Sequence, residues 1–103
     1  MVWLLAVLAA STVLATAPAH PAFFGIGVNS CANWLEPGQE REGRIWIMGF
    51  FSGMSAMDPV GSAVGNDTDV PALVAEVALI CRKNPSMKLM DAVAQHYRSR
   101  GRR

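Results

Sequence analysis

Two cysteines, Cys31 and Cys81, are the only thiols in this chain of 103 residues, and they follow an apolar N-terminal segment. The apolar segment predicts export, and two lone thiols in an oxidising compartment tend to form one disulfide. Such a bond would close a loop of about fifty residues and remove on the order of 4 kcal/mol of denatured-chain entropy in the loop-entropy model. The alternative is a pair of buried, reduced cysteines in a cytosolic protein. The disulfide is the favoured interpretation, and it restricts the fold to one that brings these two positions together.

Residues 1–19 have the features of a signal peptide. The stretch is uncharged and mostly apolar, and Ala17-Pro18-Ala19 offers the small-x-small pattern of a cleavage site before His20. Cleavage there removes 19 of the 103 residues and leaves a mature chain of 84. No Lys or Arg precedes the apolar stretch, so an uncleaved anchor is the alternative, although this stretch is near the short end of what spans a bilayer. We expect a cleaved leader and no membrane span afterwards.

The mature chain, 20–103, is long enough for one small domain with a modest core, and chains of this size often depend on a staple. Its formal net charge is +1, because every charged residue lies after the leader. Four arginines crowd the basic tail, 98–103, which we expect to be a solvated, frayed helix end. Residues 20–29, with two phenylalanines and two glycines, are typical of a flexible arm.

The spacing of the apolar residues predicts an all-α domain, a small bundle of about four helices. Ser30 is a suitable N-cap for a short first helix, in which Cys31 and Trp34 share one face before Pro37-Gly38 ends it. No segment alternates with a period of two over a useful length, so no strand is predicted.

A second helix is predicted over 42–57. It is apolar nearly all round, which indicates a central buried helix. Gly49 and Gly53 are four positions apart and would let a neighbouring helix approach closely, which would offset their cost of roughly 1 kcal/mol each in helix propensity. Asp58-Pro59 ends the helix.

Two more helices complete the prediction. Thr68 or Asp69 caps the third, with Pro71 in its first turn, and Arg82 and Lys83 suit its C-terminal pole. The fourth opens at Ser86, after Asn84-Pro85. Its expected inward residues are Met90, Val93, Ala94 and Tyr97.

The sequence carries no recognisable catalytic or metal-binding pattern. His20 and His96 are the only histidines, His96 is near the predicted frayed end, and no nucleophile elbow accompanies them. Both thiols are committed to each other rather than to zinc. Neither a phosphate-binding loop nor a basic face with interleaved aromatics is present. We therefore expect no enzyme activity, no cofactor, no metal and no nucleic-acid partner.

An ordered set of short motifs remains, spread over 30–97. The set is Cys31-x-x-Trp34-Leu35, then Trp46-x-x-Gly49-Phe50-x-x-Gly53, then Cys81-x-x-Asn84-Pro85-Ser86. With the leader and the lone cysteine pair, it resembles the HdeA/HdeB family of small periplasmic acid-stress chaperones. The resemblance implies a helical periplasmic protein, often a homodimer at neutral pH, with a disulfide joining the first and third helices and no enzyme activity. In acid, such a protein loosens and binds unfolding proteins through newly exposed apolar surface.

For this chain, the resemblance implies a client-binding surface made of apolar residues from the first three helices. These residues are Trp34, Trp46, Phe50, Phe51, Met54, Leu73 and Val77. With its nine Lys and Arg and two His protonated and its carboxylates neutral, the chain would carry +11 near pH 2, and this repulsion favours expansion.

Two carboxylates are the candidate pH sensors: Asp69 at a helix N-terminus and Asp91 in the first turn of the last helix. A carboxylate whose folded pKa is below its unfolded pKa contributes stability above the unfolded value. That contribution is lost as the pH falls through the folded value.

A second family is similar in outline. Periplasmic immunity proteins that block type VI secretion effectors are also small, exported, helical and disulfide-bearing. Such an inhibitor needs a stable patch at neutral pH, for which an exposed Trp34 or Trp46 would be the anchor. The sequence leaves the chaperone, the inhibitor and a plain structural domain of the envelope open.

Overall fold

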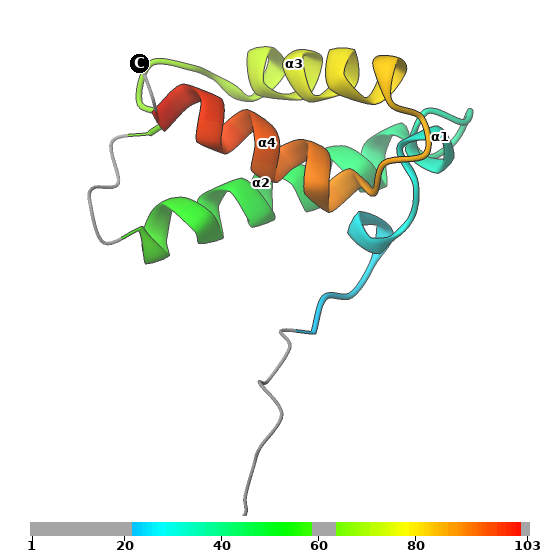
Figure 1. Ribbon diagram of the computed structural model, residues 1–103, viewed down its shortest axis with the longest axis horizontal. Coiled ribbons are helices and arrows are strands. Elements are labelled where there is room, and N and C mark those ends of the chain that lie inside the picture. Colours follow the sequence, from blue (N-terminus) through cyan, green and yellow to red (C-terminus); the bar gives the residue numbers. More distant parts are fainter. Residues whose placement is uncertain (1–21, 59–63, 102–103) are drawn as a thin grey trace, which may run out of the picture.

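The computed structural model describes residues 22–58 and 64–101, and within these ranges the fold is all-helical, as expected (Figure 1). The predicted leader, 1–19, lies outside the described residues. The elements in chain order are a short 3-10 helix η2 (Ile26–Val28), α1 (Cys31–Trp34), α2 (Glu40–Met57), α3 (Val70–Lys83) and α4 (Leu89–Gly101).

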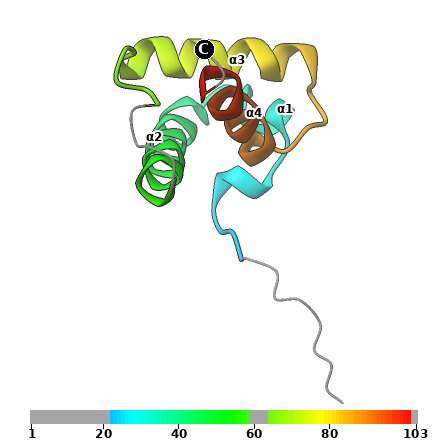
Figure 2. The same cartoon turned by 60° about the vertical axis from the view of Figure 1, so that its left-hand side comes forward.

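The last helix, α4, is the central element of the bundle. It lies between α2 and α3 and packs on both, as the two views in Figures 1 and 2 agree. At one end of the bundle, α1 contacts α3 and α4, while η2 contacts α2 and α4. The expectation that 42–57 would form the central buried helix is therefore wrong, because α2 packs with one face only and leaves the other exposed.

Two helix starts follow the predicted capping chemistry. The Ser30 hydroxyl accepts a hydrogen bond from the Asn33 backbone N–H at 3.1 Å and so begins α1. The Asp69 carboxylate accepts one from the Ala72 backbone N–H at 2.9 Å and begins α3, with Pro71 in the first turn.

The fourth helix begins at Leu89 rather than at Ser86. The segment before it forms a turn, in which Met87 N–H donates to the Asn84 carbonyl at 3.0 Å, and also forms backbone hydrogen bonds with the start of the domain. Cys31 N–H donates to the Met87 carbonyl at 2.7 Å, and Leu89 N–H donates to the Asn29 carbonyl at 2.9 Å. These bonds fix a non-helical connection that sequence periodicity does not reveal.

The core lies between α2, α3 and α4 and continues under α1 and η2. Val93 and Tyr97 are buried as predicted, whereas Met90 and Ala94 are only half-buried. The buried apolar residues of the described ranges are Ile26, Cys31, Trp34, Ile47, Phe51, Leu73, Val77, Ala78, Cys81, Leu89, Ala92, Val93 and Tyr97.

The prediction that Gly49 and Gly53 let a helix approach closely is wrong. A Cβ built at either position has no atom within 4 Å. The glycine that permits close packing in α2 is Gly43, where a Cβ would come within 2.0 Å of the Trp34 indole. Gly27 likewise permits close packing of Trp46, because a Cβ at Gly27 would lie 2.0 Å from the Trp46 indole. In both places a ring, rather than a helix backbone, occupies the space that the missing side chain leaves.

Candidate functional site

The predicted cross-link between Cys31 and Cys81 is present. It joins the first residue of α1 to the last turn of α3, with the two Cα atoms 5.0 Å apart, and both residues are fully buried. Close to the disulfide, the Ala32 N–H donates a backbone hydrogen bond to the Pro85 carbonyl at 2.9 Å. This end of the bundle is therefore held by covalent and backbone bonds, none of which changes charge between neutral and acid pH.

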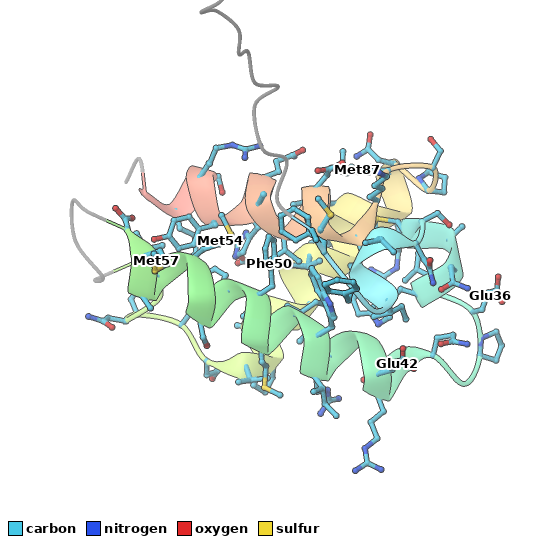
Figure 3. All side chains as sticks on the ribbon, turned by 90° about the horizontal axis from the view of Figure 1, so that it is seen from below. Glu36, Glu42, Phe50, Met54, Met57 and Met87 are labelled. Carbon is cyan, nitrogen blue, oxygen red and sulfur yellow. A yellow bond between two sulfur atoms is a disulfide. The ribbon has the colours of Figure 1, made fainter. Side chains whose placement is uncertain are left out.

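The predicted client-binding residues are concealed in the folded chain. Trp34, Phe51, Leu73 and Val77 are buried, and the other three residues of the set are partly buried and packed on the core. Phe50 and Met54 lie on the side of α2 that faces α4 (Figure 3). These seven residues come from α1, α2 and α3, and the core unites them into one apolar region beside α4.

The arm and α2 share an aromatic contact. The Trp46 indole N–H donates to the Phe24 carbonyl at 2.8 Å, and the ring of Phe50 lies 4.7 Å from that of Trp46 and 5.8 Å from that of Phe23. Residues 20–29 were predicted to form a flexible arm, but the second half of this segment forms η2, in which Ile26 is buried. Beyond this contact the outer face of α2 is apolar and exposed, with Ile45 54% and Met57 82% accessible.

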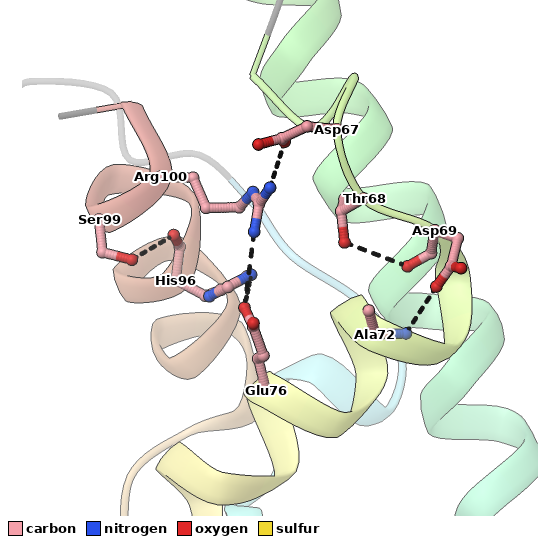
Figure 4. A network of polar contacts seen from close by, with 8 residues as sticks. All are labelled: Asp67, Thr68, Asp69, Ala72, Glu76, His96, Ser99 and Arg100. Carbon is pink, nitrogen blue, oxygen red and sulfur yellow. Dashed lines mark hydrogen bonds and ion pairs between the residues drawn. The ribbon is translucent and has the colours of Figure 1, made fainter. Parts of the chain in front are cut away.

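A group of charged side chains lies where α3, α4 and the loop before α3 meet (Figure 4). We call Asp67, Glu76, His96 and Arg100 the ionic cluster. His96 Nε2 lies 3.0 Å from Glu76 Oε2, and Arg100 Nη1 lies 3.6 Å from the same oxygen. The other terminal nitrogen of Arg100 pairs with the carboxylate of Asp67. One guanidinium thus bridges a loop carboxylate and a helix carboxylate.

Burial of the two basic members distinguishes this cluster from an ordinary surface ion pair, although Glu76 and Asp67 are 40% and 76% exposed. His96 is 3% exposed and the side chain of Arg100 is 6% exposed. The expectations that 98–103 is a solvated tail and that His96 lies at a frayed end are wrong for these two residues, because α4 continues through Gly101 and turns them onto α3. Arg98 is exposed, as expected, and residues 102–103 are outside the described part of the chain.

A further polar contact ties α4 to the end of α2. The Tyr97 hydroxyl donates to the Asp58 carboxylate at 2.6 Å, and the Tyr97 ring lies 5.2 Å from that of Phe51. The hydrogen bond to Asp58 raises the pKa of the Tyr97 hydroxyl, and burial and the negative charge of Asp58 raise it further.

The two predicted pH sensors lie apart from the ionic cluster. Asp69 serves as the cap of α3, and Asp91 is exposed in the first turn of α4. Their sensing role stays a prediction. Sequence reasoning missed Asp67, Glu76, His96 and Arg100 as a group, and the one local signal was the spacing of four between His96 and Arg100, which places both on one face of α4.

A groove of about 450 Å3 runs between α3 and the connection from α1 to α2. Trp34 contributes to its lining but is 3% exposed, so Trp34 is not the exposed anchor that an inhibitor would need. Trp46 is half-buried. The remaining lining residues are Leu35, Glu36, Pro37, Gly38, Glu40, Arg44, Pro71, Val74, Ala75, Ala78 and Arg82.

Within 22–58 and 64–101, no three His, Cys, Asp or Glu residues are grouped so that they could hold a metal ion. In the same ranges, no helix has the length and apolarity needed to cross a membrane. In three comparisons with known proteins, no family model, no curated protein and no solved structure matches the chain.

Proposed function

We propose that the protein is a non-enzymatic holdase of the periplasm that loosens at low pH and binds unfolding client proteins. The observation that carries the proposal is the concealment of its apolar side chains. A surface that holds clients only in acid has to be hidden at neutral pH, and the predicted client-binding residues are packed among the helices of the folded chain. Loosening of α2 and α3 from α4 would uncover the members of this set that lie on α2 and α3.

The position of the disulfide supports reversible loosening. Cys31 and Cys81 enclose the whole of α2 and most of α3, with a sequence separation of 50. Acid does not break this bond, so the opened chain stays compact and its helices stay close to one another. Refolding after neutralisation then needs no search for the pairing of α1 with α3.

The test is an aggregation assay with the mature chain, 20–103, and an acid-sensitive client protein at pH 7 and pH 2. We expect suppression of light scattering and binding of an apolar dye in acid only, and both should reverse on neutralisation. Met54→Gln, which places an amide on the concealed surface, should weaken protection. Leu79→Gln is the matched control, because Leu79 is exposed on the outer side of α3.

A chain that stays rigid at pH 2 and protects no client would end the holdase proposal. A neutral-pH homodimer is part of the same proposal, and sedimentation at pH 7 and pH 2 measures it. Repeating the assay with reductant tests whether the cross-link is needed for recovery.

The groove beside α3 favours a second candidate, an immunity protein that inhibits a type VI secretion effector. The groove is present on the folded chain, and its lining combines apolar residues with charges such as Glu36 and Arg82. An inhibitor should form a tight complex with one toxin at pH 7 and neutralise it. Ala75→Trp would fill the groove and abolish the complex, whereas Ala72→Trp, outside the groove on the same helix, would not.

A further inference from the structure

The ionic cluster joins two buried basic side chains, His96 and Arg100, to two carboxylates that reach solvent, with Glu76 40% and Asp67 76% exposed. Arg100 comes from α4, Glu76 from α3 and Asp67 from the preceding loop, so three segments depend on one guanidinium. His96, one turn before Arg100, approaches the same carboxylate oxygen of Glu76. A buried charge is tolerated only while it is paired, because removal of the partner leaves an uncompensated charge out of water.

Acid reverses the charge balance of this cluster. At neutral pH with His96 uncharged, two carboxylates face one guanidinium, and the cluster carries −1. Carboxylates ordinarily titrate near pH 4 and imidazoles near pH 6.5. Below these values the carboxylates are neutral, and His96 and Arg100 are two cations at neighbouring positions of α4, so the cluster carries +2.

Groups of α2 and α4 also lie near the cluster. From α2, the ring of Phe51 faces His96 at 6.2 Å, and the Asp58 carboxylate is bonded to Tyr97. Asp58 also becomes neutral in acid. The remaining basic residue of this part of α4, Arg98, points to solvent. Separation of α4 from α3 and the loop lets water reach both cations and so relieves their repulsion.

We propose that Asp67, Glu76, His96 and Arg100 form an acid-operated latch, which holds the 64–69 loop and α3 against the C-terminal half of α4 and opens that end of the bundle first. The end that carries the disulfide stays closed. The physiological use of the latch rests on the proposed holdase function, but the latch itself is a property of the folded chain.

The sign of the pH dependence follows from the charges of the cluster. Loss of the two negative charges leaves Arg100 without its ion-pair partners, so this end of the bundle becomes less stable in acid. Protonation of His96 beside Arg100 adds repulsion once Glu76 is neutral. The latch therefore needs the loss of negative charge and the gain of positive charge together.

Hydrogen exchange of the disulfide-bonded mature chain, measured residue by residue from pH 7 to pH 3, tests the order of opening. After correction for intrinsic exchange rates, we expect protection to be lost first in 64–76 and 94–101, and last around Cys31 and Cys81. Loss of protection at the same pH throughout the chain, or first beside the disulfide, would overturn the latch. This measurement needs no variant.

Variants then identify the groups responsible. Glu76→Gln keeps a hydrogen-bond acceptor but removes the charge, and should raise the opening midpoint by about one pH unit. His96→Gln keeps a donor for Glu76 but cannot become a cation, and should lower the midpoint by about half a pH unit. Glu36→Gln, at an exposed carboxylate in the connection from α1 to α2, should leave the midpoint unchanged. A midpoint that His96→Gln does not move would overturn the latch.

The latch and the holdase can be rejected independently of each other. Opening at the cluster without protection of a client would reject the holdase and keep the latch. If the chain protects a client but the end with the ionic cluster opens last, the latch is rejected and the holdase is kept.

Discussion

At the α1 end of the bundle, the chain is held by the Cys31–Cys81 bond and by backbone hydrogen bonds from Cys31, Ala32 and Leu89. At the other end, where α2 and α4 finish, the ties are the ionic cluster and the hydrogen bond from Tyr97 to Asp58 (Figure 1). The bonds of the first end have no titrating member, while the ties of the second consist of titrating side chains. The two ends of one small core therefore respond differently to pH.

The comparison explains how a small bundle can loosen without losing its fold. If every contact weakened in acid, a domain of this size would unfold entirely, since total stability is usually only about 5–15 kcal/mol. If none weakened, the apolar surface between the helices would stay hidden. A permanent tie at one end and a titratable tie at the other allow an opening of limited extent.

The largest expected effect comes from removing the permanent tie. We expect the double variant Cys31→Ser, Cys81→Ser to lose about 4 kcal/mol of unfolding free energy, because the cross-link closes a loop of 50 residues. Chemical denaturation at pH 7 measures the loss. The loss should be similar at pH 5, and one that grows steeply towards acid would show that the two ends are not independent.

The packing of the disulfide end should be the next most sensitive feature. In Gly43→Ala, a Cβ would lie within 2.0 Å of the Trp34 ring, and we expect a loss of about 1–3 kcal/mol from forced repacking. Gly49→Ala is the matched control in the same helix. Its Cβ enters open space, so this variant should gain up to about 1 kcal/mol. Equal losses in both variants would contradict the observed placement of α2.

Loss of the α3 cap should have a smaller effect. Asp69→Ala removes the acceptor for Ala72 N–H and should cost about 1 kcal/mol in thermal or chemical unfolding. Asp69→Asn keeps a capping oxygen and should cost less. Asp69→Asn could instead lose as much unfolding free energy as Asp69→Ala and also shift the acid midpoint. The charge of Asp69 would then matter more than its hydrogen bond, as its predicted role as a pH sensor requires.

The smallest effect is expected in alkali, from Tyr97. Its raised pKa means that the folded state holds the phenol proton more tightly than the unfolded state. The resulting stability is fully present below pH 10, the ordinary tyrosine value, and is lost as the pH rises through the folded pKa. Tyr97 is the only tyrosine, so tyrosinate absorbance reports it alone. Ionisation at or below pH 10 would argue against the Asp58 contact, and Tyr97→Phe should abolish the absorbance change.

Much of the fold could be predicted from local features. The helix caps at Ser30 and Asp69, the breaks after Lys83 and Met57, and the pairing of the cysteines depend on neighbouring residues or on a count of two thiols. The errors concern which face of a helix is covered. Because α2 carries apolar residues nearly all round, its sequence did not reveal that one face, within residues 45–57, is exposed. An apolar residue can lie either in a core or on a protein surface.

The ionic cluster could not be predicted for a different reason. Its members are Asp67, Glu76, His96 and Arg100, which come from a loop and two helices, and nothing in the chain between them indicates that they meet. Arg100 looked like part of a basic tail because four arginines lie in 98–103. Only the crossing of α4 over α3 separates the buried Arg100 from the exposed Arg98.

By itself, the sequence determined the helical class, the limits of most helices and the cross-link, since each follows from periodicity, capping chemistry or the reactivity of two thiols. Tertiary structure alone decided that α4 lies at the centre, that Trp34 and Trp46 rest on Gly43 and Gly27, and that two basic side chains of α4 share a carboxylate of α3. The physical reason is range. Capping and periodicity act over three or four residues, whereas burial and charge pairing depend on which distant segments exclude water from the same place.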